Sequence, residues 1–304
     1  MNRESWVRLL RAELWAILPS ALDRIIAADG QIEAASARPA SRAGSVAVLP
    51  IYGPISRRAD FLSMLMGGTS VEAITAMLRP AVADESVGSI VLDVDSPGGT
   101  VDGIPELADE IHAARGTKTV VAVANTMAAS AAYWLASQAD ELIVSPSAEV
   151  GSIGVFALHE DVSRALDSLG VTVTMIAAGK YKVEGNPFEP LGEEARAAIQ
   201  GRVDDYYGQF VAAVARGRGV TAANVRAGYG EGRVVGANEA VRLGMADRVA
   251  TMTDTLRRLA DPRRRGQVGR GKAAEIGPFI EDQEIGAQAD LDLRRRRLRL
   301  RSGA

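Results

Sequence analysis

The chain has 304 residues, of which 47% are hydrophobic and 24% charged, with a formal net charge of −3, so it can bury the core of a globular domain. It has no cysteine, which excludes disulfides, thiolate metal ligands and a cysteine nucleophile. Its two histidines, His112 and His159, lie far apart in the sequence, so a catalytic metal site is not expected.

Residues 1–29 predict a separate helical segment. Apolar residues recur at helical spacing until Pro19, and Ser20 with Asp23 then resembles a capping box that opens a second short helix. The recurring residues are Trp6, Leu9, Leu10, Leu14 and Ile17. Charged residues interrupt this segment, so it has no apolar stretch of the kind that a signal peptide needs, and we expect a cytoplasmic protein.

Residues 30–44 have no apolar periodicity and are predicted to be a linker. From residue 45 to about 259, short β-branched runs alternate with helical stretches. This alternation is typical of parallel strands covered on both faces, so the predicted fold class is α/β with one copy of the core. Strands are predicted at 45–52, 89–96, 119–125, 141–145, 152–158 and 171–178, and helices from about residues 70, 101, 129, 161 and 192.

Two further stretches bear on size and partners. Residues 120–136 are the most apolar run, but polar residues interrupt them and they fall short of the ~20 residues that a membrane-spanning helix needs. Residues 260–304 hold eleven Lys and Arg against seven Asp and Glu, which leaves a net charge of −7 for residues 1–259. This basic tail is predicted to be disordered, with contact to an acidic protein surface or nucleic acid as the alternative.

The first motif that could carry chemistry is the turn Ser96-Pro97-Gly98-Gly99, directly after a predicted buried strand. Proline ends the strand, and glycine allows a positive φ and a close approach of the backbone to a ligand. The helix predicted from about Val101 leaves unpaired N–H groups beside this turn. Such a turn can direct backbone donors toward an oxyanion, although it is also common in proteins of any function.

The second motif is "NTMAASAAYWLAS" at residues 125–137. It places Ser130 between a strand and a helix, where the N–H groups of Ser130 and Ala131 are not used by the helix. Small neighbouring residues allow a substrate backbone to come close. By itself this pattern also fits a buried serine in an alanine-rich helix, and it differs from the GxSxG elbow of the α/β-hydrolases.

The third motif is "GKYKVEGNPFEPL" at residues 179–191, where Lys180 and Lys182 lie in a loop after a predicted strand. A loop lysine is normally exposed and protonated. To act as a general base, its pKa must fall from about 10.4 to near neutrality, which burial in an apolar site can achieve.

Together with "DSPGG" and "VGSIGV" at residues 150–155, these motifs resemble the signal peptide peptidase A (protease IV) family of serine peptidases. The resemblance covers about residues 46–249 and is strongest to the single-domain bacteriophage branch that serves capsid assembly. It implies a crotonase-like core shared with the Clp protease, without a cofactor or metal. The chain has Ala131 and Ala132 where cellular members usually have two glycines.

The resemblance also implies the roles of the site residues. Ser130 would be the nucleophile and Lys182 the general base, with Lys180 as a bystander. Gly98 or Gly99 and Ala131 would offer the oxyanion N–H groups.

Two further residues have possible roles by the same resemblance. His159 stays open as an alternative base, with Asp161 as its orienting carboxylate, because Clp-type relatives use a histidine downstream of their serine. Ser152 would orient the lysine by hydrogen bonding.

The implied function is a serine endopeptidase that acts through an acyl-enzyme on capsid or scaffold proteins during phage head assembly. Since members with one core copy share their sites between subunits, we expect a ring-like homo-oligomer in which Lys182 reaches Ser130 of a neighbour. Residues 55–68, with the apolar Phe61, Leu62, Met64, Leu65 and Met66, are predicted either to line the entrance of such an oligomer or to pack between its subunits.

Three alternatives remain open. The first is a signal-peptide or general peptide-degrading peptidase of the same family. The second is a crotonase-fold acyl-CoA hydratase or isomerase, which would need a catalytic carboxylate and a CoA site. The third is a non-catalytic assembly scaffold.

Overall fold

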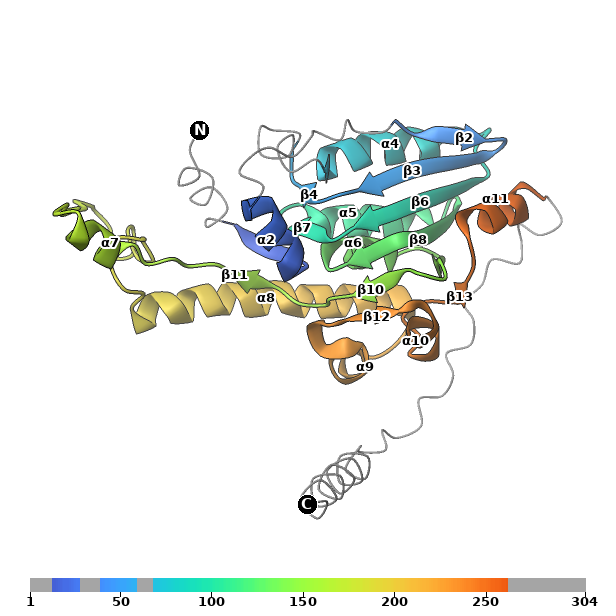
Figure 1. Cartoon of the computed structure of the whole chain (residues 1–304). Coiled ribbons are helices and arrows are strands. Elements are labelled where there is room, and N and C mark those ends of the chain that lie inside the picture. The colour runs from blue at the N-terminus through green and yellow to red at the C-terminus, as the bar shows by residue number, and fades with distance from the viewer. Residues whose placement is uncertain (1–12, 28–38, 59–67, 262–304) are drawn as a thin grey trace, which may run out of the picture. The chain divides into compact units, whose positions relative to one another are not determined.

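The computed structural model describes residues 13–27, 39–58 and 68–261, which form two β-sheets and the helices around them (Figure 1). The larger sheet has the strand order β12-β10-β8-β6-β3-β2, and β9 pairs with both β8 and β13. Its strands are β2 (Ser41–Ala43), β3 (Val46–Tyr52), β6 (Ser89–Ser96), β8 (Thr119–Ala129), β9 (Glu141–Val144), β10 (Glu149–Gly151), β12 (Val234–Gly236) and β13 (Arg248–Val249).

The centre of this sheet is parallel. β3 pairs with β6 and β6 with β8 in parallel register, and β8 then serves two further partners. The first half of β8 pairs with β9, and its last residues pair with β10. The α/β class with parallel strands that the sequence predicts is therefore confirmed.

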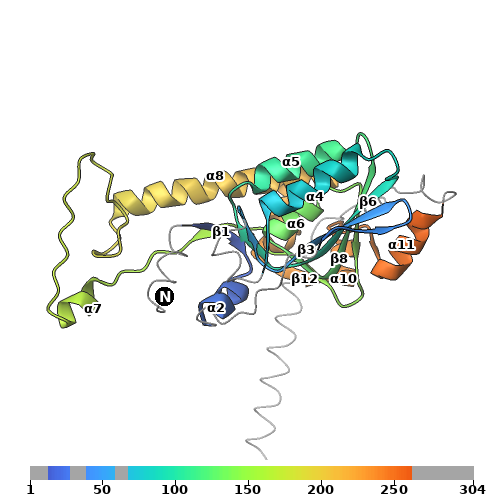
Figure 2. The same cartoon turned by 90° about the horizontal axis from the view of Figure 1, so that it is seen from above.

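Both faces of the larger sheet are buried, which explains the nearly continuous apolar runs of its strands. On one face, Ile90 and Leu92 join the main core with α4 (Val71–Ala83), α5 (Ile104–Ala114) and α6 (Ala131–Ala136). On the other face, Val91 packs with Leu259 of α11 (Met252–Ala260). Figure 2 shows α4, α5 and α6 on one side of the strands and α11 on the other.

The smaller sheet has the order β11-β1-β7-β4-β5 and lies beside the start of α6. Its strands are β1 (Leu14–Ile17), β4 (Ile55–Ser56), β5 (Thr69–Ser70), β7 (Gly98–Thr100) and β11 (Phe156–Ala157). β1 is antiparallel to both of its neighbours, β7 and β11. The chain's N-terminal segment is thus built into the sheet that carries the glycine turn.

The remaining helices are α2 (Pro19–Ala27), α7 (Ser163–Ser168), α8 (Glu193–Arg218), α9 (Ala222–Gly228) and α10 (Ala237–Arg242), with a 3-10 turn at Gly230–Gly232. Apart from Ala195, the buried residues of α8 lie in its C-terminal part, where Phe210 stacks on Trp134 of α6 at 4.5 Å between ring centroids. Its N-terminal part, together with α7 and the segment between them, extends away from the two sheets (Figures 1 and 2).

Four local predictions from the sequence were wrong. The helix predicted over Leu14 and Ile17 is strand β1, because a sheet edge at β7 is available to pair with it. The strand predicted over 152–158 is only the short β11, and part of the predicted linker is β2. The strand predicted over 171–178 is irregular and exposed, since no strand of the described residues lies beside it.

The domain boundaries at 29, 44 and 259 stay predictions. The apolar residues 61–66 and the tail from residue 262 onward lie outside the described residues.

A buried ion pair connects α8 to the larger sheet. The two terminal nitrogens of Arg218 donate to the two carboxylate oxygens of Asp247 at 2.8 Å each, and both side chains are less than 5% exposed. Asp247 also accepts the backbone N–H of Leu142 in β9 at 2.7 Å. Burial by itself would lower the pKa of Arg218, but the hydrogen bonds and charge of Asp247 raise it well above its usual range.

Replacing Asp247 with alanine is therefore expected to lower the free energy of unfolding by about 3–5 kcal/mol, because it leaves a buried guanidinium without its partner. Glu239→Ala breaks the exposed pair with Arg242 and is the matched control, with an expected loss of at most about 1 kcal/mol. Urea unfolding followed by circular dichroism measures both losses. Equal losses for the two variants would contradict the structural role of Asp247.

Candidate active site

Ser130 lies at the junction of β8 and α6 in a strained backbone conformation, with φ 56° and ψ −121°. Among the described residues, only Ser130, Ser152 and Glu231 combine a side chain with a positive φ. Such conformations cost on the order of 1–3 kcal/mol and persist where the surrounding structure enforces them, often at active sites. Ser130 thus lies between a strand and a helix, as the sequence predicts.

Two contacts hold the Ser130 backbone in this conformation. Its N–H donates to the carbonyl of Gly151 at 2.7 Å, and its carbonyl accepts the N–H of Trp134 at 2.9 Å in the first turn of α6. The residue is only 1% exposed, and its hydroxyl lies 3.5 Å from the carbonyl oxygen of Gly154. Ser130 therefore lies at the N-terminus of α6 and is buried by other segments of the chain.

The glycine turn lies directly against Ser130. A Cβ added to Gly98 would meet Ser130 Cβ at 2.9 Å and the carbonyl oxygen of Ala16 at 2.2 Å, and Gly98 has φ 97°. A Cβ on Gly99 would meet the carbonyl oxygen of Ile55 at 1.7 Å. Both positions need glycine for space, and Gly98 needs it for its backbone conformation as well.

The predicted oxyanion donors differ in their present partners. The N–H of Gly98 donates to Ser96 Oγ at 3.2 Å, while Gly99 pairs with Ala16 of β1. Ala131 is the first residue of α6, a position where backbone N–H groups have no partner within the helix. The structure thus brings Ser130, Gly98, Gly99 and Ala131 together. β1 is paired with the strand that contains the two glycines.

Ser152 also lies close to this site. It follows Gly151, the acceptor of the Ser130 N–H, and it is 5% exposed with φ 53°. Its own N–H donates to the carbonyl of Arg233 at 2.8 Å. The buried, strained position is compatible with a role in orienting a partner of Ser130.

The two lysines of the third motif lie on the exposed segment between α7 and α8. Lys182 is exposed, and the hydrogen bond of the Ser130 hydroxyl within the described chain is to Gly154 rather than to Lys182. Lys180 donates to the hydroxyl of Tyr181 at 2.7 Å and to the carboxylate of Glu194 at 3.0 Å. These hydrogen bonds raise the pKa of Lys180. Within one chain, the predicted base and nucleophile are not assembled.

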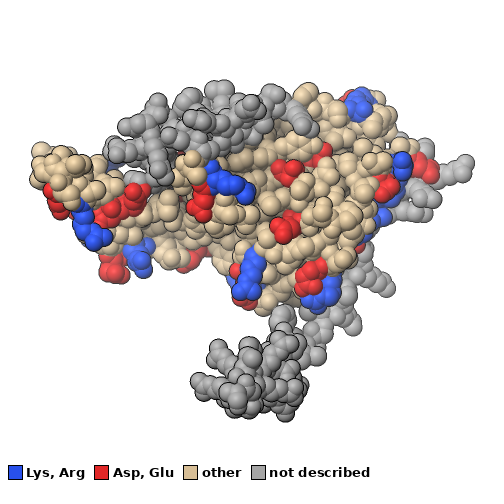
Figure 3. Space-filling view, viewed as in Figure 1, with Lys and Arg blue, Asp and Glu red and all other residues tan. Residues whose placement is uncertain are grey.

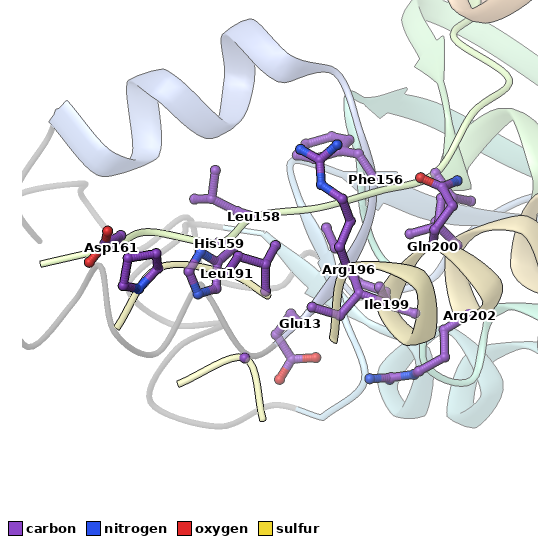
Figure 4. Close-up of a pocket in the computed structure, with 16 residues that line it drawn as sticks. Glu13, Phe156, Leu158, His159, Asp161, Leu191, Arg196, Ile199, Gln200 and Arg202 are labelled. Atoms are coloured by element: carbon purple, nitrogen blue, oxygen red, sulfur yellow. The ribbon is translucent and has the colours of Figure 1, made fainter. Parts of the chain in front are cut away.

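His159 lines a different place, a groove of about 970 Å³ between β11 and the first half of α8 (Figure 4). Its Nε2 lies 3.3 Å from the carbonyl oxygen of Asn186. The carboxylate of Asp161 accepts the N–H of Ser163 at 2.9 Å, and the hydrogen bonds from Ser163 are the main reason that the pKa of Asp161 is lowered. Ser130 is not among the residues that line this groove.

Ala16, whose carbonyl lies beside Gly98, is a residue of the site that was not predicted from the sequence. The signal was the uninterrupted apolar run from Leu14 to Leu18, which is typical of a short buried strand. Pro19 also favours an extended conformation in the residue before it. The helical spacing of the earlier apolar residues outweighed both signals.

The described residues hold no helix long and apolar enough to cross a membrane, and no group of three or more acidic, histidine or cysteine side chains placed to bind a metal. On the face shown in Figure 3, basic and acidic residues lie in small mixed groups.

Comparisons with known proteins place the site in a family context. The chain is 35% identical over 248 residues to the capsid assembly protease C of Escherichia phage lambda, covering 81% of this chain and 56% of that protein. It is 35% identical over 211 residues to the head-tail preconnector protein GP5 of Enterobacteria phage P21, covering 69% and 42%. Protease 4 of Salmonella typhi is 30% identical over 224 residues, covering 73% and 35%.

The chain thus spans about half the length, or less, of these curated relatives. Among solved structures, a mutant of ClpP1 from Listeria monocytogenes is similar with a TM-score of 0.43 at 17% sequence identity, covering 69% of this chain and 94% of that one.

A family model provides the assignment. The model described as peptidase family S49 matches residues 112–264, which include both Ser130 and Lys182. This match covers half of the chain and agrees with the resemblance found in the motifs, so the chain belongs to peptidase family S49.

Proposed function

We propose that this protein is a serine endopeptidase with a Ser130–Lys182 dyad that processes capsid or scaffold proteins during phage head assembly. The observation that carries the proposal is the strained backbone of Ser130 beside Gly98 at the start of α6. A strained turn at a helix start, next to a glycine turn, can direct a serine hydroxyl and backbone N–H groups toward one substrate carbonyl once the site is open.

The chemistry follows from these positions. Lys182, in its neutral form, takes the proton of the Ser130 hydroxyl while the oxygen attacks a peptide carbonyl, and the resulting oxyanion is stabilised by the N–H groups of Ala131 and of Gly98 or Gly99. The amine leaving group then takes the proton from Lys182. A water molecule, deprotonated by the same lysine, hydrolyses the acyl-enzyme and regenerates Ser130.

Lys182 is supplied by a neighbouring copy of the chain in this proposal. A lysine base must be neutral, and burial favours the neutral form. Because Lys182 is exposed on a segment that extends from the sheets, its amine becomes buried only when another chain covers it. The exposed apolar side chains of the same segment support such packing between copies: Leu169, Val171, Val173, Met175 and Ile176.

The proposed substrates rest on the relatives. The two phage proteins are named for capsid assembly and for the head-tail preconnector, and both align with this chain at 35% identity. Ser152 is proposed to orient Lys182 in the assembled site, since it is buried and lies next to the acceptor of the Ser130 N–H.

A fluorophosphonate probe tests the proposed nucleophile. An activated Ser130 oxygen attacks the phosphorus and displaces fluoride, so mass spectrometry should find the phosphonyl adduct on Ser130 and not on the Ser130→Ala variant. Ser168→Ala, which changes an exposed serine at the end of α7, is the control and should label like the unchanged protein. An adduct yield at Ser130 no higher than at exposed serines would contradict the proposal.

A further inference from the structure

The strand β1 lies between β7, whose Gly98 lies against Ser130, and β11, which follows Gly154 near the Ser130 hydroxyl. In the smaller sheet, β1 is the connection between β7 and β11, and it runs antiparallel to both. Without β1, β7 and β11 would each present an unpaired strand edge to the space between them. Such a pair of edges is suited to bind an extended polypeptide by main-chain hydrogen bonds.

The register places the middle of β1 at the glycine turn. The N–H of Leu18 donates to the carbonyl of Pro97 at 2.8 Å, and the N–H of Val101 donates to the carbonyl of Leu14 at 3.1 Å. Hydrogen-bonded pairs alternate along an antiparallel ladder, so Ala16 and Gly99 form the hydrogen-bonded pair between these two bonds. β1 therefore uses the backbone groups of Gly99.

The same register brings β1 against the nucleophile. A Cβ on Gly98 would touch both the carbonyl oxygen of Ala16 and the Cβ of Ser130, so both atoms lie around the same position beside this glycine. Ser130 is only 1% exposed in this arrangement. A polypeptide substrate has no path to pair with β7 while β1 is in place.

All four residues of β1 are buried, and among the described residues their side chains divide between two clusters. Trp15 and Ile17 face away from the main core and form a separate cluster with α2, to which only Phe156 is added from outside residues 13–27. Leu14 and Ala16 are the members of this segment that join the main core. Because Trp15 and Ile17 pack with α2 rather than with the main core, the N-terminal segment can leave the sheet together with α2 as one unit.

We propose that β1 is a built-in competitor of the substrate: it fills the strand position that an incoming polypeptide takes, and it must leave before Ser130 can act. The proposal rests on the function proposed above. Because β1 and the site belong to one chain, its effective concentration is high, and the fraction of open sites limits the apparent affinity for substrate.

The substitution Ala16→Pro tests this. Proline removes the N–H that pairs with Gly99 and disfavours the strand between two partners, so β1 should leave the sheet. Ala16→Gly keeps the N–H at the same position and is the matched control. The rate of fluorophosphonate labelling at Ser130 is expected to rise at least about tenfold in Ala16→Pro and to stay within about threefold in Ala16→Gly.

A peptide of residues 13–19 added to the Ala16→Pro protein should return the labelling rate to the level of the unchanged chain. The same peptide with proline at the position of Ala16 should have no effect. The peptide experiment distinguishes displacement of β1 from a general loosening of the site. The peptide can lower the labelling rate of Ser130 only by binding in a vacant strand position.

Three outcomes are distinguishable. A higher rate that the peptide suppresses supports the proposal. Equal rates of Ser130 labelling in the unchanged chain and in a folded Ala16→Pro protein would overturn it and leave the proposed peptidase standing. No labelling of Ser130 in either protein would overturn the proposed nucleophile itself.

If Ala16→Pro does not fold, the covalent connection can be cut instead. A recognition site for a specific protease, inserted after residue 28 and cleaved once the chain has folded, leaves the N-terminal segment bound only by its contacts. Dilution should then release the N-terminal segment and raise the labelling rate of Ser130. If the segment is shown to have dissociated and the labelling rate does not change, the proposed competition is refuted.

Discussion

Replacing Lys182 with alanine is expected to lower the rate of peptide cleavage by roughly 10²–10⁴-fold, whereas Lys180→Ala should retain most of the activity. The two lysines differ in what surrounds them, although only one residue separates them. Lys180 is held by Tyr181 and Glu194, and these hydrogen bonds raise its pKa, which favours the protonated form that cannot accept a proton from Ser130. A general base contributes roughly 10²–10⁴ in rate, so loss of Lys182 removes most of the catalysis.

The measurement is kcat/KM on an internally quenched peptide, made in the Ala16→Pro background so that the site is open, with His159→Ala as the third variant. His159 lines the groove beside α8 and contacts Asn186, so its loss is expected to change the rate less than about threefold. If His159→Ala were the inactive variant and Lys182→Ala were active, the base would be the histidine. The groove of Figure 4 would then have to close onto Ser130.

The sequence was most informative where one physical cause determines a local structure. The apolar β-branched runs at 46–52 and 89–96 are strands because both faces of a parallel sheet are buried. The helix predicted from about residue 70 starts as expected, since the side chain of Ser70 accepts the N–H of Ala73 at its first turn. The position of Ser130 between a strand and a helix was also predicted, because an apolar strand pattern ends and a helical pattern begins on either side of it.

The sequence was less informative where the structure depends on a distant partner. Leu14 and Ile17 fit both a helical face and a short strand, and the edge of β7 decides between them. The alternating residues 171–178 have the pattern of a strand, but a strand needs a neighbour to pair with, and the described residues of one chain do not supply it.

The proposed site also depends on a partner that one chain does not supply. Ser130, Gly98 and Ala131 are assembled within a single chain, but exposed Lys182 is not part of that assembly. Local sequence determines a turn and a helix start, whereas in the proposed site the meeting of Ser130 with Lys182 depends on how copies of the chain pack.

Mixing Ser130→Ala chains with Lys182→Ala chains is expected to restore activity that neither variant has alone. Each Lys182→Ala chain keeps an intact Ser130, and each Ser130→Ala chain keeps an intact Lys182. In a ring, one heterologous contact repeats around the axis, so random mixing pairs an intact serine with a neighbour's intact lysine at about one site in four. The recovered rate is then about a quarter of that of the unchanged protein.

Co-expression with two different affinity tags and purification on both supplies oligomers that contain both variants. The control is the double variant Ser130→Ala/Lys182→Ala mixed with Lys182→Ala, in which no intact lysine is present and no activity should return. If base and nucleophile belonged to the same chain, every site in the test mixture would lack one of them. Verified mixed oligomers without activity would therefore refute the shared site, and recovery near a quarter would require Lys182 to cross the subunit boundary.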